Sequence, residues 1–199
     1  MISEFISHFA KCIEIVDAKA PQASNARKPD IKYSPGIGPF QEKKLIKMVT
    51  DEMKNQNQIF NSIVTEEKYP NLSRKKLDIY WQSDENNYFI EAKAMRRLRN
   101  NGTPEEFIMV DLLSPYEGDG SVLGDIKKLL NSGFQGKKVI MIYGYDYDEW
   151  PLDIAIDCFE VLAERHFCKF SEKYQHKFNN LIHPHHKKGE VYAWVIDEK

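Results

Sequence analysis

The sequence predicts an α/β fold in which helices flank a mixed sheet. The segment KKVIMIYGY (137–145) is a nearly continuous apolar run, which is typical of a strand covered on both faces. The segment 77–95, LDIYWQSDENNYFIEAKAM, predicts two strands at about 76–82 and 88–94, joined by a polar turn at 84–87. Apolar residues at helical spacing before and after these strands predict helices that cover the sheet.

The N-terminal segment is predicted to be an amphipathic helix, because its apolar residues recur at helical spacing. These residues are Ile2, Phe5, Ile6, Phe9 and Ile13. Residues 17–38 follow as an irregular connection, longer than compact domains usually contain. Its basic residues are Lys19, Arg27, Lys28 and Lys32. We expect this segment to be either a mobile tether or a basic arm that contacts a polyanion.

A second helix is expected to open at Gly38-Pro39, because proline favours the first helical position. Glu42 then lies in the positive first turn of the helix, and Leu45, Ile46 and Val49 form its buried stripe. Residues 59–64 are predicted to be a strand, whereas the apolar segment 105–113 fits either a strand or a helix.

The second half of the chain is expected to contain three further helices and two strands. Ser121 is predicted to cap a helix that runs to about Asn131 and precedes the strand 137–145. Residues 153–167 are expected to form an amphipathic helix, and a second helical stretch should follow before a final strand at 190–196. The inward residues of the first are Ile154, Cys158, Val161 and Leu162, and those of the second are Phe170, Tyr174, Phe178 and Leu181. A C-terminal helical extension is therefore predicted.

Composition limits the possible functions of this chain. With 199 residues, a formal net charge of -2 and 42% hydrophobic residues, it is expected to be one soluble domain. Any nucleic-acid-binding surface must be local, because the chain as a whole is not basic. Its cysteines, Cys12, Cys158 and Cys168, lack metal-binding spacing and predict reduced thiols in a cytoplasmic protein. No stretch reaches the roughly 18 apolar residues of a membrane helix, so no membrane association is expected.

Charged residues gather at one end of the predicted hairpin. Glu91 and Lys93 point to the same face of their strand and Ala92 points to the other, because strand side chains alternate. Asp78 begins the partner strand, which the hairpin brings alongside. Two converging carboxylates repel each other unless a cation lies between them, and oxygen ligands favour Mg²⁺ or Mn²⁺. The carbonyl of Ala92 would add a third oxygen.

This pattern resembles the PD-(D/E)xK nuclease superfamily, whose members share the restriction-endonuclease-like fold. The resemblance rests on Asp78, twelve intervening residues and Glu91-Ala92-Lys93, on apolar strands, and on an order of helix, three strands, helix and strand over residues 39–145. Leu77 stands where the name-giving proline would precede the aspartate. The resemblance implies that Asp78, Glu91 and Ala92 hold the metal, that Lys93 positions the attacking water, and that Glu42 completes the acidic cluster. Glu52 is the weaker candidate for that helix acid.

Basic residues near this motif suggest a contact with nucleic acid. Arg96, Arg97 and Arg99 follow the strand directly, and Lys43 lies beside Glu42, so these four side chains are expected to contact phosphates. A solvated basic turn is the alternative for the arginines, and Lys127-Lys128 are expected to face water.

The cluster His183-Pro184-His185-His186 suggests either a zinc site or a polar loop. We favour the loop, because the proline breaks the helical spacing and no cysteine lies nearby.

The sequence therefore predicts a single nuclease-like domain over residues 1–199. It would comprise an N-terminal helix and arm (1–38), a catalytic core with a restriction-endonuclease-like fold (39–145) and a C-terminal extension (146–199). The expected activity is Mg²⁺- or Mn²⁺-dependent hydrolysis of phosphodiester bonds without an organic cofactor, and a DNA endonuclease is favoured. A homodimer would allow cleavage of both strands of a duplex. The alternative is a relative of the same fold that binds nucleic acid without cutting it.

Overall fold

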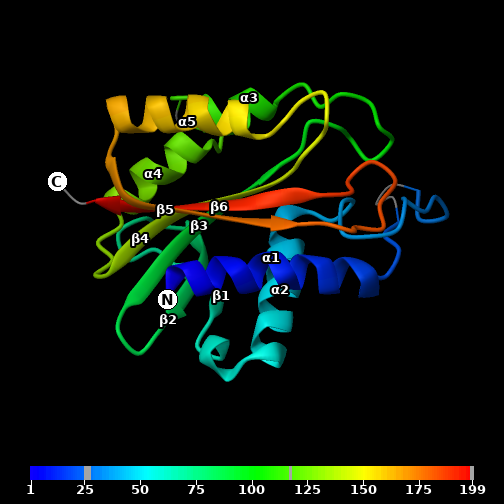
Figure 1. Ribbon diagram of the computed structural model, residues 1–199. Helices are drawn as coiled ribbons and strands as arrows, with labels where there is room; N and C mark the ends of the chain where they lie inside the picture. Colours follow the sequence, from blue (N-terminus) through cyan, green and yellow to red (C-terminus); the bar gives the residue numbers. More distant parts are fainter. Residues whose placement is uncertain (25–27, 117, 198–199) are drawn as a thin grey trace.

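The computed structural model describes residues 1–24, 28–116 and 118–197 (Figure 1). Within this part of the chain, six strands form one sheet in the order β1-β2-β3-β4-β6-β5. The strands are β1 (Val64–Lys68), β2 (Lys76–Gln82), β3 (Asn87–Met95), β4 (Lys137–Tyr145), β5 (Lys169–Phe178) and β6 (Gly189–Asp197). Strands β3 and β4 are parallel, and the other neighbouring pairs are antiparallel. The predicted mixed α/β sheet is therefore confirmed.

Helices cover both faces of the sheet (Figure 1). Helices α1 (Ile2–Lys19) and α2 (Glu42–Gln56) lie on one face, and α3 (Ile108–Leu113), α4 (Val122–Leu130) and α5 (Asp153–His166) lie on the other. Parallel strands cannot be joined by a tight turn, so the chain crosses over from β3 to β4 through α3 and α4. None of the helices in the described ranges is both long enough and apolar enough to span a bilayer.

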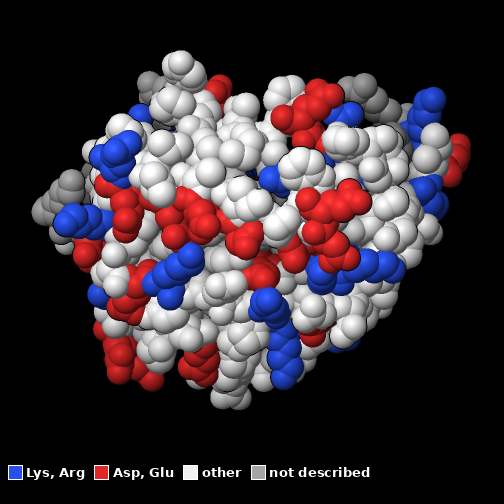
Figure 2. Space-filling view, turned by 45° about the horizontal axis from the view of Figure 1, so that its top comes forward, with Lys and Arg blue, Asp and Glu red and all other residues white. Residues whose placement is uncertain are grey.

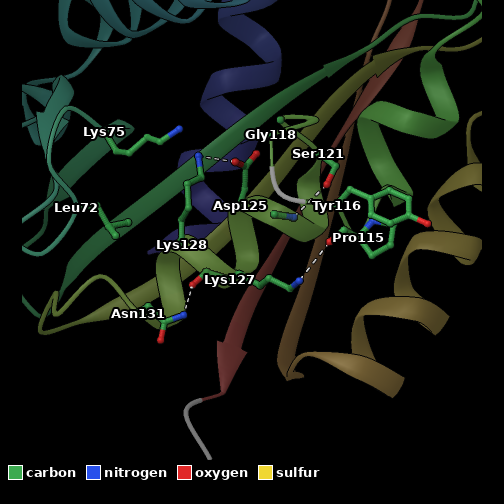
Figure 3. Close-up of a pocket in the computed structure, with 12 residues that line it drawn as sticks. Leu72, Lys75, Pro115, Tyr116, Gly118, Ser121, Asp125, Lys127, Lys128 and Asn131 are labelled. Carbon is green, nitrogen blue, oxygen red and sulfur yellow. Dashed lines mark hydrogen bonds and ion pairs between the residues drawn. The ribbon is translucent and has the colours of Figure 1, made fainter.

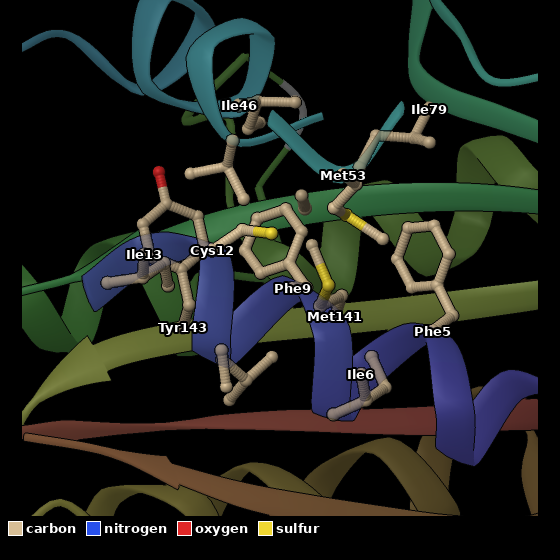
Figure 4. Close-up of a cluster of buried hydrophobic side chains, with 14 of the residues drawn as sticks. Phe5, Ile6, Phe9, Cys12, Ile13, Ile46, Met53, Ile79, Met141 and Tyr143 are labelled. Carbon is tan, nitrogen blue, oxygen red and sulfur yellow. The ribbon is translucent and has the colours of Figure 1, made fainter. Parts of the chain in front are cut away.

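The core between α1, α2 and the sheet is rich in aromatic residues (Figure 4). The predicted stripe of α1 is buried, and the ring centroid of Phe5 lies 5.1 Å from that of Trp81 on β2. Phe9 reaches Tyr143 on β4, with 5.9 Å between centroids. Large rings that pack in this way contribute most of the apolar area that a core removes from water. This layer fixes α2, and hence Glu42, against the sheet.

The crossover helix α4 follows the prediction from sequence. The side chain of Ser121 accepts a hydrogen bond from the backbone N–H of Gly124 at 3.1 Å, which satisfies one of the free amides at the helix start. The strand that follows, β4, is buried along nearly all of its length, as its continuous apolar sequence predicted. Both elements pack against β3, the strand that carries Glu91 at its centre.

The prediction of a strand at residues 59–64 is wrong. Residues Gln58–Phe60 form a short 3-10 helix, and the edge strand β1 begins at Val64. The apolar residues Phe60 and Ile63 fill the core below α1 instead of forming a ladder. The true edge strand, VTEEK, is mostly polar, which suits a strand with one unpaired edge.

The prediction of a second helix after α5 is also wrong, because that segment forms the strand β5. Residues spaced by four share one face in a helix and also in a strand, so Tyr174 and Phe178 fit both structures. A register shift between Phe170 and Glu172 places Phe170 in the core on the other face of the sheet. β5 pairs with β6 along its whole length. The C-terminal extension is therefore one helix and two strands, not a helical unit.

Helix α5 exists as predicted, but a different stripe is buried. Ile154 and Val161 are exposed, whereas the buried residues are Ala155, Ile156, Phe159 and Ala163. Both stripes have helical spacing, and the ring of Phe159 decides between them by packing on Trp194, with 5.1 Å between centroids.

Two helix boundaries also differ from expectation. Helix α2 begins at Glu42, three residues after the start predicted at Pro39. Its predicted apolar stripe is buried as expected. The ambiguous segment 105–113 contains the six-residue helix α3.

The connection between α1 and α2 is fastened by the buried side chain of Asp17, which is 1% exposed. Its Oδ1 accepts from the backbone N–H of Ile37 at 2.8 Å, and its Oδ2 accepts from that of Ile182 at 2.6 Å. Within the connection, Lys32 donates to the hydroxyl of Ser24 at 2.9 Å. Arg27, one of the basic residues expected here, lies outside the described residues. The segment that leads into α2 is thus held to both ends of the chain.

We predict that Asp17→Asn lowers the free energy of unfolding by roughly 1–3 kcal/mol, because an amide has only one oxygen to offer to two buried N–H groups. Urea denaturation measures this difference. Asp51→Asn, at an exposed aspartate of α2, is the matched control. Equal stability of the two variants would contradict the role assigned to Asp17.

Candidate metal-binding site at the end of the hairpin

The site begins where strand β2 separates from β3. The ladder between these strands ends at the pair Ile79–Ile90. Two residues beyond Ile90, the backbone N–H of Ala92 donates to Oδ2 of Asp78 at 2.9 Å. A carboxylate has therefore replaced the neighbouring strand as the acceptor for this amide. The N–H and C=O of one strand residue point to the same side, so the carbonyl of Ala92 also faces the opened gap.

A local distortion of β1 accompanies this separation. Glu66 has a positive φ of 59°, which is unfavourable for a residue with a side chain. It stands opposite Asp78, between the paired positions Thr65–Ile79 and Glu67–Leu77. Backbone strain of this kind persists only where the surrounding structure imposes it, and it is concentrated at functional sites.

Glu42 satisfies the next free amide on the same edge of β3. Its Oε2 accepts from the backbone N–H of Ala94 at 2.6 Å. Ala92 and Ala94 are two residues apart, so both amides point toward the gap. Burial raises the pKa of the Glu42 carboxyl, while Lys93 and the hydrogen bond from Ala94 lower it and Asp78 raises it further. Glu42 and Asp78 therefore come together at the same strand edge.

Glu91 is the most buried member of the site, with 3% of its surface exposed. Its Oε1 accepts from the hydroxyl of Tyr69 and lies 3.2 Å from Nζ of Lys128. Its carboxyl lies close enough to that of Asp78 for the two charges to act on each other. Burial, followed by the charge of Asp78, raises the pKa of Glu91 well above its ordinary value of 4.5. Two carboxyl groups thus meet in a place with little water.

Helix α4 supplies two residues of this cluster that were not expected from sequence. Asp125 is buried, and its Oδ1 lies 2.6 Å from Nζ of Lys128. The expectation that Lys127 and Lys128 face water is wrong for Lys128, which bridges Asp125 and Glu91. Burial lowers the pKa of Lys128, but the charges of Glu91 and Asp125 outweigh burial and raise it. One signal in the sequence was available, because Asp125 interrupts the apolar stripe that α4 turns to the sheet.

Lys93 lies beside these carboxylates without being bound to one of them. Its side chain is half-buried, and its charge lowers the pKa of Glu42, of Asp111 and of Asp125. Among the described residues, Lys93 forms no ion pair within 4.0 Å. Its ammonium is therefore available to an anion that enters the site.

The four basic residues expected to contact phosphates all have partners within the protein. Arg96 is half-buried and donates to the carbonyl of Gly38 at 3.0 Å, so it supports the loop that precedes Glu42. The guanidinium of Arg97 lies 4.9 Å from the ring centroid of Trp150, and Nε of Arg99 lies 3.6 Å from Glu105. Lys43 pairs with Glu66 at 2.8 Å. Arg99 and Lys43 are the more exposed of the four and can exchange these partners for a phosphate at least cost.

The segment 183–186 is a loop before the last strand, as expected, but two of its histidines are buried. His183 and His186 are buried and stacked, with 4.3 Å between their ring centroids. Burial lowers the pKa of His183 to about 4 and that of His186 to about 3, so both rings are neutral near pH 7. Nδ1 of His183 accepts from the backbone N–H groups of His185 and His186 at 3.2 Å each. The ring proton of His183 is therefore on Nε2, which leaves no lone pair for zinc.

Acidic side chains gather across the middle of the face shown in Figure 2, with basic side chains interspersed in small groups. The described residues form no broad basic surface on this face, in agreement with the low net charge of the chain. A nucleic acid that binds here must therefore be held by a few defined contacts.

The donors at the strand gap suit a hard cation such as Mg²⁺ or Mn²⁺. The backbone contact of Asp78 uses Oδ2 and the ion pair of Glu91 uses Oε1, so each carboxylate keeps a second oxygen. The carbonyl of Ala92 would be a third ligand. In the described parts of the chain, no group of three or more His, Cys, Asp or Glu side chains has the geometry of a metal site. Any such site would thus combine two carboxylates with a backbone carbonyl and water.

Comparisons with models of protein families, with curated proteins and with solved structures found no match to this chain.

We predict that Glu91→Gln stabilises the metal-free protein, and that the gain grows as pH rises. The pKa of Glu91 is higher in the folded state, so its contribution to stability is complete below about pH 4.5 and is lost as pH rises through the folded value. A neutral amide avoids this loss and can donate to Asp78. Melting temperatures measured in EDTA from about pH 5 to about pH 8 test this expectation.

Glu106→Gln, at an exposed glutamate, is the control. A stability difference between wild type and Glu91→Gln that stays constant with pH would contradict the buried repulsion.

Proposed function

We propose that this protein is a nuclease that hydrolyses phosphodiester bonds in DNA and depends on Mg²⁺ or Mn²⁺. The observation that carries the proposal is the meeting of Asp78, Glu91 and Glu42 at the gap between β2 and β3. Beside them lies the ammonium of Lys93, which forms no ion pair with any described residue. These are the four side chains that the resemblance to the PD-(D/E)xK superfamily selects. They come from three separate elements, so a chance match in sequence does not explain why they meet.

The order of elements also supports the proposal of a restriction-endonuclease-like core. Helix α2 is followed by the antiparallel strands β1, β2 and β3, then by the short helix α3, by α4, and by β4 parallel to β3. The resemblance implies this order of a helix, three antiparallel strands, a helix and a further strand. Strands β6 and β5 extend the same sheet beyond it.

Asp78 and Glu91, with the carbonyl of Ala92, would hold the metal. When bound, the metal would supply positive charge to the phosphate and lower the pKa of a coordinated water. The chain's own residues prepare the site. Backbone amides fix the carboxylates of Asp78 and Glu42, Tyr69 fixes that of Glu91, and Lys128 compensates the buried charge.

Lys93 has the role nearest to the reacting phosphate. An ammonium that forms no ion pair within the described protein can donate hydrogen bonds to a phosphate oxygen or orient the attacking water. Donors positioned in advance stabilise the charge that develops in the transition state. Catalysis in this proposal depends on a lysine that the fold leaves available.

An inactive relative that binds nucleic acid without cutting it is the alternative. It would retain Asp78 and Glu42 as acceptors of backbone amides but would cleave no DNA with any divalent metal. We propose that the protein acts in the cytoplasm. A homodimer is required only if both strands of a duplex are cut.

We predict that Lys93→Ala lowers the rate of DNA cleavage by about 10²- to 10³-fold while the protein stays folded. Asp78→Asn should lower the rate at least as much, because it also removes a metal ligand. Cleavage is measured on circular single-stranded and duplex DNA with Mg²⁺ or Mn²⁺, and circular dichroism checks the fold. Lys47→Ala, at an exposed lysine of α2, is the control.

Cleavage by Lys93→Ala at the wild-type rate would exclude the assigned role of Lys93. Absence of cleavage by the wild type with either metal would favour the binding protein over the nuclease.

A further inference from the structure

A cavity of about 400 Å³ opens beside the carboxylate cluster, between α4 and the loops that carry Leu72 and Tyr116 (Figure 3). Its size falls in the range of small-molecule sites, which is roughly 300–1,000 Å³. Asp125 and Lys128 line the cavity and also belong to the site around Glu91. A group bound in the cavity would therefore lie next to the proposed catalytic residues.

The cavity has the charge of an anion site. Among the described residues that line it, the lysines Lys75, Lys127 and Lys128 outnumber the acids, of which there is one, Asp125, by two charges. Lys128 is bound to Asp125 and Glu91, but the other two lysines are more available. Lys127 is exposed and contacts the carbonyl of Pro115 at 3.3 Å. Lys75 forms no ion pair with any described residue, and Figure 3 shows its ammonium directed over the cavity toward Lys128.

The cavity also has an apolar side. Leu72, Pro115 and Tyr116 line it, and the side chain of Tyr116 is 74% exposed at its rim. An exposed aromatic ring next to lysines matches the two parts of a nucleotide, because bases stack on aromatic rings and phosphates pair with ammonium groups. Glycines at 118, 120 and 124 line the cavity without side chains that would fill it.

We propose that this cavity holds one unpaired nucleotide of a DNA strand, and that the protein acts on single-stranded DNA. The base stacks on Tyr116, and its flanking phosphates pair with Lys75 and Lys127. The cleavage part of this inference rests on the proposed nuclease function. The cavity has room for one nucleotide but not for a base pair within a stack. A duplex could use it only after unpairing, which costs a few kcal/mol.

Fluorescence anisotropy with a labelled DNA strand of about 12 nucleotides, alone and as a duplex, tests the inference. Ca²⁺ replaces Mg²⁺ to prevent turnover. We expect the single strand to bind more tightly than the duplex. Tyr116→Ala should weaken single-strand binding about 5- to 150-fold. Because the ring is exposed, this variant leaves the core unchanged.

The double variant Lys75→Ala/Lys127→Ala should also weaken binding to the single strand. It should reduce the slope of log affinity against log salt by about 0.7 for each lost phosphate contact. Lys11→Ala/Lys54→Ala is the matched control, because these lysines lie on α1 and α2 at the opposite face of the sheet.

Wild-type affinity of both cavity variants for the single strand, or equal wild-type affinity for strand and duplex, would overturn the inference. The experiment can contradict the nucleotide-binding cavity and the nuclease activity independently of each other. Binding that depends on Tyr116 without any cleavage supports the cavity and contradicts the nuclease. Cleavage that Tyr116→Ala leaves unchanged, with unchanged binding, overturns the cavity and retains the nuclease.

Discussion

The arrangement of the site depends on one hydrogen bond, from the backbone N–H of Ala92 to the carboxylate of Asp78. This bond occupies the place where strand β2 would otherwise have continued its ladder with β3. Because β2 turns away, the edge of β3 beyond Ile90 is open, and its two free amides are available to acidic side chains. Asp78 takes the first and Glu42 takes the second. A sheet that paired to its end would satisfy these amides with backbone carbonyls and would have no acidic cluster.

The same arrangement places a large electrostatic cost inside the protein. Glu91, Asp125, Asp78 and Glu42 lie close enough for their charges to affect one another, and burial raises the pKa of Glu91, Asp125 and Glu42. Lys128 offsets part of this repulsion by bridging two of the acids. Groups with perturbed pKa values that gather at one place are candidates for a functional site. The stability lost here is what a bound cation would restore.

Sequence reasoning located the centre of the fold but not its periphery. The hairpin and β4 have unambiguous patterns, since a polar turn separates two apolar runs and a continuous apolar run has one common explanation. The strand β5 has spacing that a helix would also show, so only its pairing with β6 decides its structure. In α5 two apolar stripes compete, and the choice depends on the position of Trp194, which is distant in sequence.

The residues of the candidate site also divide into those that sequence reasoning found and those that it missed. Asp78, Glu91 and Lys93 were found from sequence because they lie on neighbouring strands of one hairpin, whose register is set locally. Tyr69 and Lys128 were missed because their contacts with Glu91 depend on a loop and on a crossover helix. Arg96 was assigned to phosphate from its position alone, whereas the structure places its guanidinium on the carbonyl of Gly38.

Anomalous diffraction from crystals grown with Mn²⁺ tests most directly whether this gap between strands is a metal site. We expect one strong peak, with carboxylate oxygens of Asp78 and Glu91 and the carbonyl oxygen of Ala92 at about 2.0–2.6 Å. Asp78→Asn crystals under the same conditions should lack that peak. A wild-type structure at saturating Mn²⁺ with no peak between these carboxylates would contradict the proposed metal-dependent nuclease.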